Sequence, residues 1–112
     1  MAVQPAPYFY MVTFEIAPQD EAEFNEIYDT DHIPSIMQVE GVLGVTRLRD
    51  AEPNASGWLV YSALYLLARP DIPDTPAWKA KSEIGRWPPV IRPKVKSRQR
   101  RLGRIVARFG TQ

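Results

Sequence analysis

The segment EIYDTDHIPSIM, residues 26–37, contains the only histidine of the chain, His32. Histidine titrates near neutral pH, so His32 could accept and return a proton in general acid–base catalysis. Asp29 and Asp31 precede it closely, and we expect them to favour its charged form or to fix its tautomer. Tyr28 lies four residues earlier, so Tyr28 and His32 share a face if the helix continues that far. Alternatively, His32 ends a helix, bonds a carboxylate or the backbone, and takes no part in catalysis.

Three tyrosines, Tyr10, Tyr61 and Tyr65, fall on predicted strands and are candidates for a ligand pocket. Tyr61 and Tyr65 have the same parity, so they share one face of the sheet. Phenol groups that line a cavity can donate a hydrogen bond to a carbonyl or stack on a flat ligand. The alternative is that these rings fill the core and that their hydroxyls bond to the protein itself.

Trp78 and Trp87 could form the wall of the same pocket near the second helix, although core packing or a subunit contact would also suit them. Arg47 could hold a ligand carboxylate or enolate through a bidentate contact, and its alternative partner is one of the acids near the N-terminus. A hydrophobic or aromatic small molecule is therefore the ligand class that we expect.

Several kinds of chemistry are excluded by composition. The chain has no cysteine and one histidine, which leaves only carboxylates as metal ligands, and their paired spacing is absent. It contains no glycine-rich phosphate loop and no dinucleotide fingerprint. We therefore expect no metal and no cofactor. Residues 92–104 are strongly basic, but they lack interleaved aromatics and an RNA-binding signature, so no nucleic-acid partner is expected.

A length of 112 residues suits one domain, with residues 1–7 as an irregular lead-in and residues 8–112 as the domain. The apolar stretches are too short to span a membrane, and the N-terminus lacks the basic start of a signal peptide, so a cytoplasmic protein is expected. Acidic residues dominate before Arg47, and no acid follows Glu83. The two halves could contact one another, within or between chains, or form two solvated faces.

Hydrophobic periodicity and breaker residues predict the secondary structure. Asp20 and Glu23 form a capping-box pattern at the start of the first helix, and Asp74 or Thr75 should cap the second. Pro34 must kink or restart the first helix near His32, because proline lacks an N–H group and opposes helical geometry before it. The predicted strands are 8–16, 42–50, 58–67 and 102–109, the last beginning as early as residue 98; the predicted helical pieces are about 20–30, 35–39 and 76–84.

The element order is β-α-β-β-α-β, which is typical of the ferredoxin-like α+β fold with a four-stranded antiparallel sheet. The first and third strands are apolar on both faces, so helices must cover one face and a second layer the other. The chain has no elements left for that layer. A homodimer packed sheet against sheet would provide it.

Residues 24–34, FNEIYDTDHIP, resemble the first-helix motif of EthD-like dimeric α+β barrel proteins. In that family a V-x-G segment and a strand ending in arginine follow, as in residues 39–41 and Arg47 here, and Tyr65 matches a tyrosine late in the third strand. The resemblance implies the dimeric barrel fold. It also implies an active-site histidine at position 32, by similarity to isomerase relatives. Relatives differ in role, however, so fold does not fix function.

The leading hypothesis is a pocket between the helices and the sheet, or at the barrel edge beside His32, used by a cofactor-free isomerase, cyclase or lyase. His32 would move a proton next to a carbonyl, Tyr65 or Tyr10 would polarise that carbonyl, and Arg47 would hold an anionic group. Tyr28, Tyr61, Trp78 and Trp87 would bind the substrate. The alternatives are a non-catalytic ligand-binding or accessory protein, and a cofactor-free or haem-linked monooxygenase in which His32 would be the haem ligand.

Overall fold

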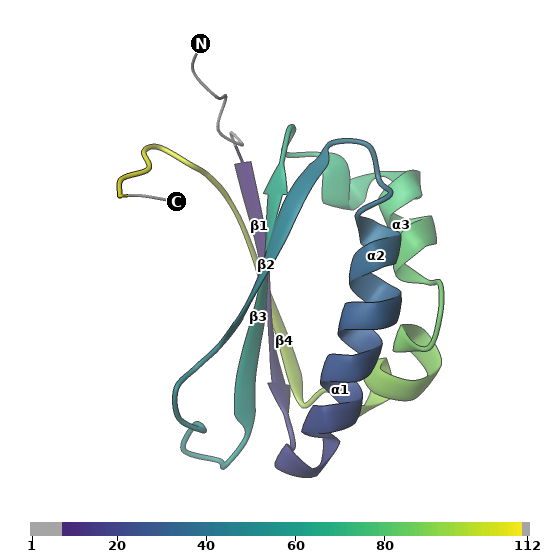
Figure 1. The fold of residues 1–112 in the computed structure, drawn as a ribbon, viewed down its shortest axis with the longest axis vertical. Coiled ribbons are helices and arrows are strands. Elements are labelled where there is room, and N and C mark those ends of the chain that lie inside the picture. Colours follow the sequence, from purple (N-terminus) through teal and green to yellow (C-terminus); the bar gives the residue numbers. More distant parts are fainter. Residues whose placement is uncertain (1–7, 111–112) are drawn as a thin grey trace.

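The computed structural model describes residues 8–110, so the predicted lead-in at 1–7 lies outside the described residues. It confirms the ferredoxin-like β-α-β-β-α-β order and the four-stranded antiparallel sheet, whose spatial order is β2-β3-β1-β4 (Figure 1). The two central strands are therefore the first and third in the chain. The strands are β1 (Tyr8–Ile16), β2 (Val42–Arg49), β3 (Leu59–Leu67) and β4 (Ser97–Arg104).

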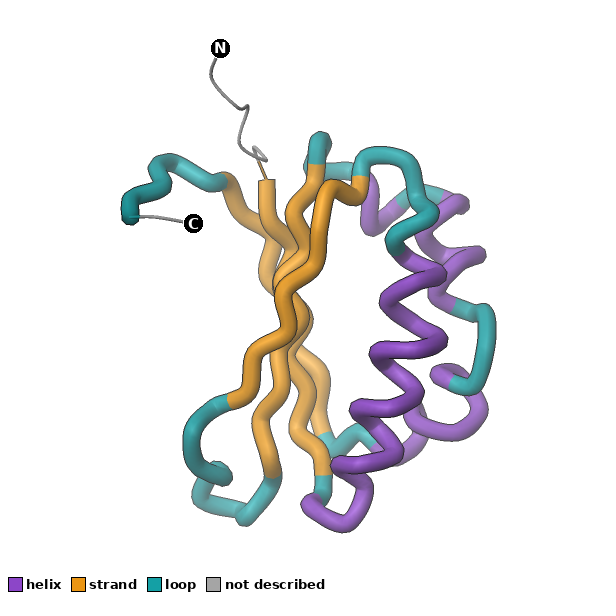
Figure 2. The backbone as a smooth tube through the Cα atoms, in the orientation of Figure 1, coloured by secondary structure: helices purple, strands orange, loops and turns teal. Residues whose placement is uncertain are grey.

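The helical layer is a series of short pieces on one face of the sheet, and Figure 2 shows the other face without a covering layer. The pieces are α1 (Glu21–Ile27), a first π turn (Tyr28–His32), α2 (Ile33–Ile36), α3 (Pro76–Ser82) and a second π turn (Trp87–Ile91), with 3₁₀ turns at Pro18–Asp20, Ile72–Asp74 and Arg92–Lys94. The second π turn begins with Trp87-Pro88-Pro89, which places prolines early in the turn, where a backbone N–H is not needed.

Every second residue of β1 and β3 is buried beneath the helices, as strand geometry requires. The alternate residues on the uncovered face are only partly exposed, and they include Phe9, Met11, Leu64 and Leu66. The prediction that both faces are apolar holds for part of the uncovered face, which is polar at Thr13, Glu15 and Ser62. One apolar face is buried in the core, and the other lies on the surface of the single chain.

The first helix does not break at Pro34 but widens. Ile33 donates its backbone N–H to the carbonyl of Tyr28, five residues earlier, which is the hydrogen bond of a π turn. In a regular α-helix the proline ring would clash with the carbonyl of Thr30, and the missing N–H would leave that carbonyl without its donor. The wider turn relieves this conflict and keeps the segment helical from α1 into α2.

The structure corrects the predicted start of the first helix and refines that of the second. Asp20 makes no side-chain cap, so the capping-box prediction was wrong, although Asp20 does precede α1. Thr75 does cap α3, since its hydroxyl accepts the backbone N–H of Trp78 at 3.3 Å. α3 ends at Ser82, two residues before the predicted end.

The predicted bounds of the fourth strand were wrong. β4 pairs with β1 from Ser97, opposite Glu15, to Arg104, opposite Tyr8. Hydrophobic residues later in the chain suggested a strand at 102–109, but Val106 and Phe109 lie almost fully exposed beyond the sheet. In this register Arg104 already pairs with Tyr8, so the residues after Arg104 extend beyond the described part of β1.

The oppositely charged halves of the sequence meet within the chain. Lys94 lies 2.6 Å from Glu23, and Arg49 lies 3.0 Å from Glu21. These pairs are exposed and each contributes little stability, typically below ~1 kcal/mol. They show that at least part of the charge segregation serves contacts between the basic segments and the acidic first helix.

Candidate functional site

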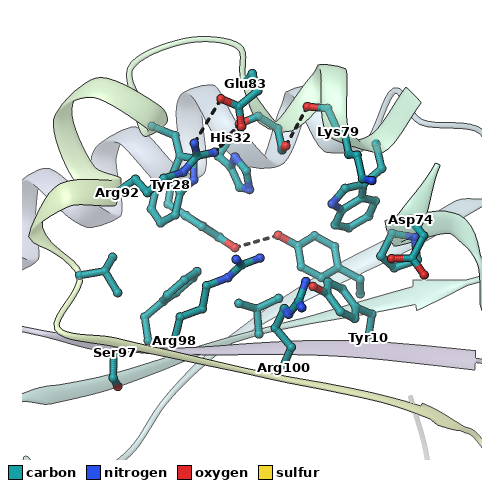
Figure 3. Close-up of a pocket in the computed structure, with 18 residues that line it drawn as sticks. Tyr10, Tyr28, His32, Asp74, Lys79, Glu83, Arg92, Ser97, Arg98 and Arg100 are labelled. Carbon is teal, nitrogen blue, oxygen red and sulfur yellow. Dashed lines mark hydrogen bonds and ion pairs between the residues drawn. The ribbon is translucent and has the colours of Figure 1, made fainter. Parts of the chain in front are cut away.

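A cavity of about 620 Å³ lies between the sheet and the helical layer, on the side of β1 and β4 (Figure 3). Its position agrees with the predicted pocket between helices and sheet. A volume of this size suits a drug-sized ligand. The lining residues are Tyr10, Val12, Phe14, Tyr28, His32, Tyr65, Pro73, Asp74, Trp78, Lys79, Ser82, Glu83, Trp87, Arg92, Val95, Ser97, Arg98 and Arg100.

Aromatic rings from separate elements form two walls of this cavity. Trp78 of α3 packs edge-on against Tyr10 and Tyr65, with ring centroids 5.6 and 5.1 Å away. Trp87 packs in the same way against Tyr28, at 5.1 Å. The structure thus brings five of the predicted substrate-contacting aromatic residues to one cavity, where they also fill the core as the alternative proposed.

The hydroxyls of Tyr28 and Tyr65 form a buried hydrogen bond of 2.7 Å at the cavity. Burial raises the pKa of Tyr28 to about 12, and burial also raises the pKa of Tyr65 well above its ordinary value. Both phenols therefore stay protonated at neutral pH. The pair carries two hydroxyl protons and uses one in its mutual bond, so the other can be donated to a ligand oxygen.

His32 lines the cavity with its ring between those of Tyr28 and Trp87, at centroid distances of 4.8 and 5.0 Å. Tyr28 and His32 are neighbours, as their spacing predicted. The ring is buried, and its Nδ1 has no hydrogen-bond partner among residues 8–110. An unpaired buried ring nitrogen is costly, because it has lost its contact with water without gaining another.

The expected effect of the flanking acids on His32 was wrong. Burial lowers the pKa of His32 to about 4, and the nearby charges of Arg92 and Arg98 act in the same direction. His32 is therefore neutral at pH 7. Asp29 and Asp31 point elsewhere: Asp29 accepts from Arg47 at 2.7 Å, and Asp31 accepts from Arg86.

Arg86 attaches the first π turn to the loop after α3. Its side chain donates to Asp31, Glu26 and Thr30, and its backbone N–H donates to Asp31 at 2.9 Å. Hydrogen bonding from Arg86 holds the pKa of Asp31 far below its usual range. Gly85 has a positive φ of 81°, and a Cβ there would lie 3.0 Å from the Asp31 carboxylate. Glycine thus permits the close approach that positions the segment bearing His32.

Arg47 and Tyr61 lie outside this cavity, on the β2 side of the first helix. The Arg47 guanidinium stacks over the rings of Phe24, Tyr28 and Tyr61, about 5 Å from each centroid, and pairs with Asp29. This agrees with the alternative in which an N-terminal acid is its partner. Tyr61 donates to Glu21 and so has its own protein partner.

The structure brings two arginines to the site that the sequence reasoning did not single out. Arg98 and Arg100 project from the helix-facing side of β4 into the cavity (Figure 3). The alternating pattern R-x-R-x-L from residue 98 was the available signal. The predicted strand was centred on 102–109, so Arg98 and Arg100 were not assigned to one of its faces. An alternating pattern identifies the face of a strand only when the bounds of that strand are known.

Neither a metal site nor a membrane-spanning helix is found among the described residues. Within residues 8–110, no three His, Asp or Glu side chains gather closely enough to hold a metal ion. No helix in that range is long and apolar enough to cross a bilayer.

The comparisons identify the fold and go no further. No protein-family profile matches the sequence, and no curated protein matches it. Among solved structures, the haem degrader MhuD of Mycobacterium tuberculosis, determined with two haems bound in its active site, is 15% identical, with a TM-score of 0.66 over 93% of this chain and 100% of MhuD. An EthD family protein of Bacillus halodurans is 16% identical, with a TM-score of 0.56 over 86% of this chain and 96% of its own.

A third similar structure is a candidate antibiotic biosynthesis monooxygenase of Bacillus cereus, 12% identical, with a TM-score of 0.59 over 93% of this chain and 97% of its own. These likenesses confirm that the chain has the fold of EthD-like and antibiotic-monooxygenase-like proteins. Identities this low leave the chemistry open, because this fold serves several reactions.

Proposed function

We propose that the protein binds a flat, hydrophobic small molecule in the cavity beside His32. The observation that carries this proposal is the cavity itself, in which aromatic walls meet a polar and charged side formed by residues of β4 and the helical layer, among them Lys79, Arg92 and Arg98. Aromatic surface beside convergent polar groups suits a small organic ligand that carries a polar or charged end. Similarity to a fold that binds haem in MhuD supports the same ligand class.

We further propose that the bound molecule undergoes a cofactor-free proton transfer, as in an isomerase, cyclase or lyase. Neutral His32 would take a proton from the carbon next to a carbonyl and return it to another carbon of the same enolate. The spare hydroxyl proton of Tyr28 or Tyr65 would donate to the carbonyl oxygen as negative charge develops there. Atoms balance within one substrate, so no oxidant or reductant is required.

The low pKa of His32 has two consequences for this proposal. Because the imidazole is neutral at physiological pH, it is in the form that accepts a proton. A pKa of about 4 also makes it a weak base in the empty site. An anionic group of the substrate near Arg98 would offset one of the charges that lower the pKa of His32. Binding of the substrate would therefore raise this pKa and make His32 a stronger base.

Turnover of hydrophobic lactones, enones and polyketide-like acids is the test. We expect a substrate whose conversion is lost in His32→Ala and retained in Glu40→Ala, an exposed position before β2. Equal turnover in His32→Ala and the parent protein would overturn the catalytic role. A ligand recovered by mass spectrometry, with no conversion in any substrate class, would favour the non-catalytic binding protein.

Oxygenation is the second candidate, supported by similarity to a haem degrader and a candidate monooxygenase. The geometry of His32 does not fit a haem ligand. A ligating histidine usually donates its other ring N–H to a carboxylate or carbonyl, and Nδ1 has no such acceptor among residues 8–110. We expect haem titration to leave the Soret band unshifted. Oxygen uptake with a converted substrate would instead favour cofactor-free oxygenation.

We also propose a homodimer formed through the uncovered face of the sheet. That face carries Phe9 and Met11 of β1 and Leu64 and Leu66 of β3, all of them only partly exposed. A second copy would bury these side chains, a gain of about 25 cal/mol for each Å² of apolar surface removed from water. A two-fold axis allows the same face to serve both protomers.

A further inference from the structure

Of the three arginines that line the cavity, Arg98 and Arg100 have no ion-pair partner within residues 8–110. Other arginines near the helical layer are ion-paired: Arg47 with Asp29, Arg86 with Asp31, and Arg92 with Glu83 at 2.6 Å. No salt bridge or hydrogen bond within residues 8–110 engages the guanidinium of Arg98 or Arg100, although both line the cavity.

The two arginines reach the cavity through strand geometry. Arg98 lies opposite Phe14 and Arg100 opposite Val12 in the register of β1 and β4. Phe14 and Val12 are buried beneath the helices, so the side chains beside them point to the same face. The spacing of two residues places both guanidinium groups along one wall, adjacent to each other and at the edge of the sheet.

The positive charge of Arg98 changes the pKa of groups inside the site. It lowers the pKa of His32, and it also acts on Tyr28 in the direction of a lower pKa. Figure 3 shows the Arg98 and Arg100 side chains directed from the strand toward the centre of the cavity. Two acids line the cavity. Glu83 is bound by Arg92, and Asp74 forms no ion pair with either arginine of β4, so the positive charge of β4 has no carboxylate in contact within residues 8–110.

Two adjacent guanidinium groups opposite aromatic walls recognise a particular kind of molecule. Arginine binds a carboxylate in a planar, two-point contact. Trp78 of α3 offers apolar surface across the cavity from that wall, and Tyr10 lies beside the arginines on the same face of the sheet. We propose that Arg98 and Arg100 bind the anionic group of the ligand, so that the substrate class is a flat aromatic or polyenic carboxylate. This inference rests on the proposed function, because it assigns the anionic end of the same ligand.

A matched pair of fluorescent probes tests this assignment. 8-Anilinonaphthalene-1-sulfonate and N-phenyl-1-naphthylamine share one ring skeleton and differ by the sulfonate, which stands in for a carboxylate. Each is titrated into the parent protein, into the double variant Arg98→Gln/Arg100→Gln, and into Arg108→Gln. Arg108→Gln removes one positive charge from the exposed chain beyond β4, half of the charge that the double variant removes, so it reports how much a lost charge outside the cavity weakens binding. Trp78→Ala reports whether either probe is in the cavity.

We expect the double variant to lose affinity for the sulfonate probe by about tenfold or more and to keep the neutral probe within about twofold. The loss should shrink in high salt, because exposed charges are screened. Arg108→Gln should bind both probes as the parent protein does, and Trp78→Ala should weaken both.

Two other outcomes would contradict the inference in different ways. If both probes bind, Trp78→Ala weakens both, and the double variant binds them unchanged, the pocket stands and the arginine assignment falls. If neither probe binds the folded protein, the assignment falls together with the proposed small-molecule site. Circular dichroism on each variant confirms that the comparison is between folded proteins.

Discussion

The hydroxyls of Tyr28 and Tyr65 lie 2.7 Å apart, which joins the first π turn to the C-terminal half of β3 inside the core. Each phenol is the hydrogen-bond partner of the other. Removing one hydroxyl therefore leaves the other with an unpaired polar group in a buried place. The pair has structural value whether or not a ligand uses its spare proton.

Tyr28→Phe and Tyr65→Phe should each reduce the free energy of unfolding by about 1–2 kcal/mol. The double variant should lose less than the sum of the two, because one hydrogen bond is removed in both cases. Urea denaturation of the parent, single and double variants gives this coupling. Tyr8→Phe, at the start of β1, is the control. Strict additivity of the two losses would mean that the hydroxyls do not interact.

Stability should depend on pH through His32. Its pKa is about 4 in the folded protein and near 6.5 when unfolded, so between these values the unfolded chain binds more protons. The free energy of unfolding should therefore be highest above pH 6.5 and fall by roughly 3 kcal/mol as the pH decreases to 4.

The comparison with His32→Gln isolates this contribution, since carboxylates that titrate in the same range are common to both proteins. Chemical denaturation at several pH values should give curves that separate between pH 6.5 and 4, with the parent protein falling more steeply. Curves that stay parallel over this range would show that His32 titrates alike in both states.

The proposed dimer contact through the uncovered face of the sheet can be tested with one charged substitution. Leu64→Glu places a carboxylate at the middle of β3, opposite Met11 and Thr46, and should convert the proposed dimer into a monomer. Ile84→Glu adds the same charge to an exposed apolar residue after α3 and should leave the assembly unchanged. Light scattering at micromolar concentration measures both. A monomeric parent protein would contradict the dimer outright.

Arg86→Gln should loosen the first π turn. Arg86 holds Asp31 and Glu26 through several donors, so its loss frees the segment that carries His32. Backbone amides of residues 28–33 should exchange with deuterium faster, while those of β1 stay protected. Arg49→Gln removes a different exposed ion pair of the same helix, with Glu21, and should leave exchange at residues 28–33 unaltered. Equal exchange in both variants would rule out a specific role for Arg86.

The sequence predicted the fold because β1 and β3 are apolar at most positions, which a central strand with two largely apolar faces explains. It predicted the pocket residues Tyr10, Tyr65 and Trp78 because aromatic residues on strands and helices facing one core must meet. β4 was misplaced because its residues are mostly polar, and an edge strand owes its pairing to the neighbouring strand.

The environment of His32 could not be predicted from its neighbours in sequence. Asp29 and Asp31 are close to His32 in the chain, but successive helical residues point in different directions. Each acid forms an ion pair with an arginine from a distant segment, Asp29 with Arg47 and Asp31 with Arg86. Desolvation by the aromatic rings then determined the pKa of His32. That quantity depends on tertiary packing, which no local pattern encodes.

The first π turn amounts to one inserted residue in an otherwise α-helical stretch. Each residue of an α-helix turns the chain by about 100°, so deleting one residue from the turn would rotate the side chains before it relative to those after it. It would also bring back the clash between the Pro34 ring and the carbonyl four residues before it. Deletion of Thr30 would thus place His32 three residues after Tyr28 instead of four and turn its ring from its present position. Whether His32 faces the cavity therefore depends on its rotation about the helix axis, and the number of residues between α1 and Pro34 sets that rotation.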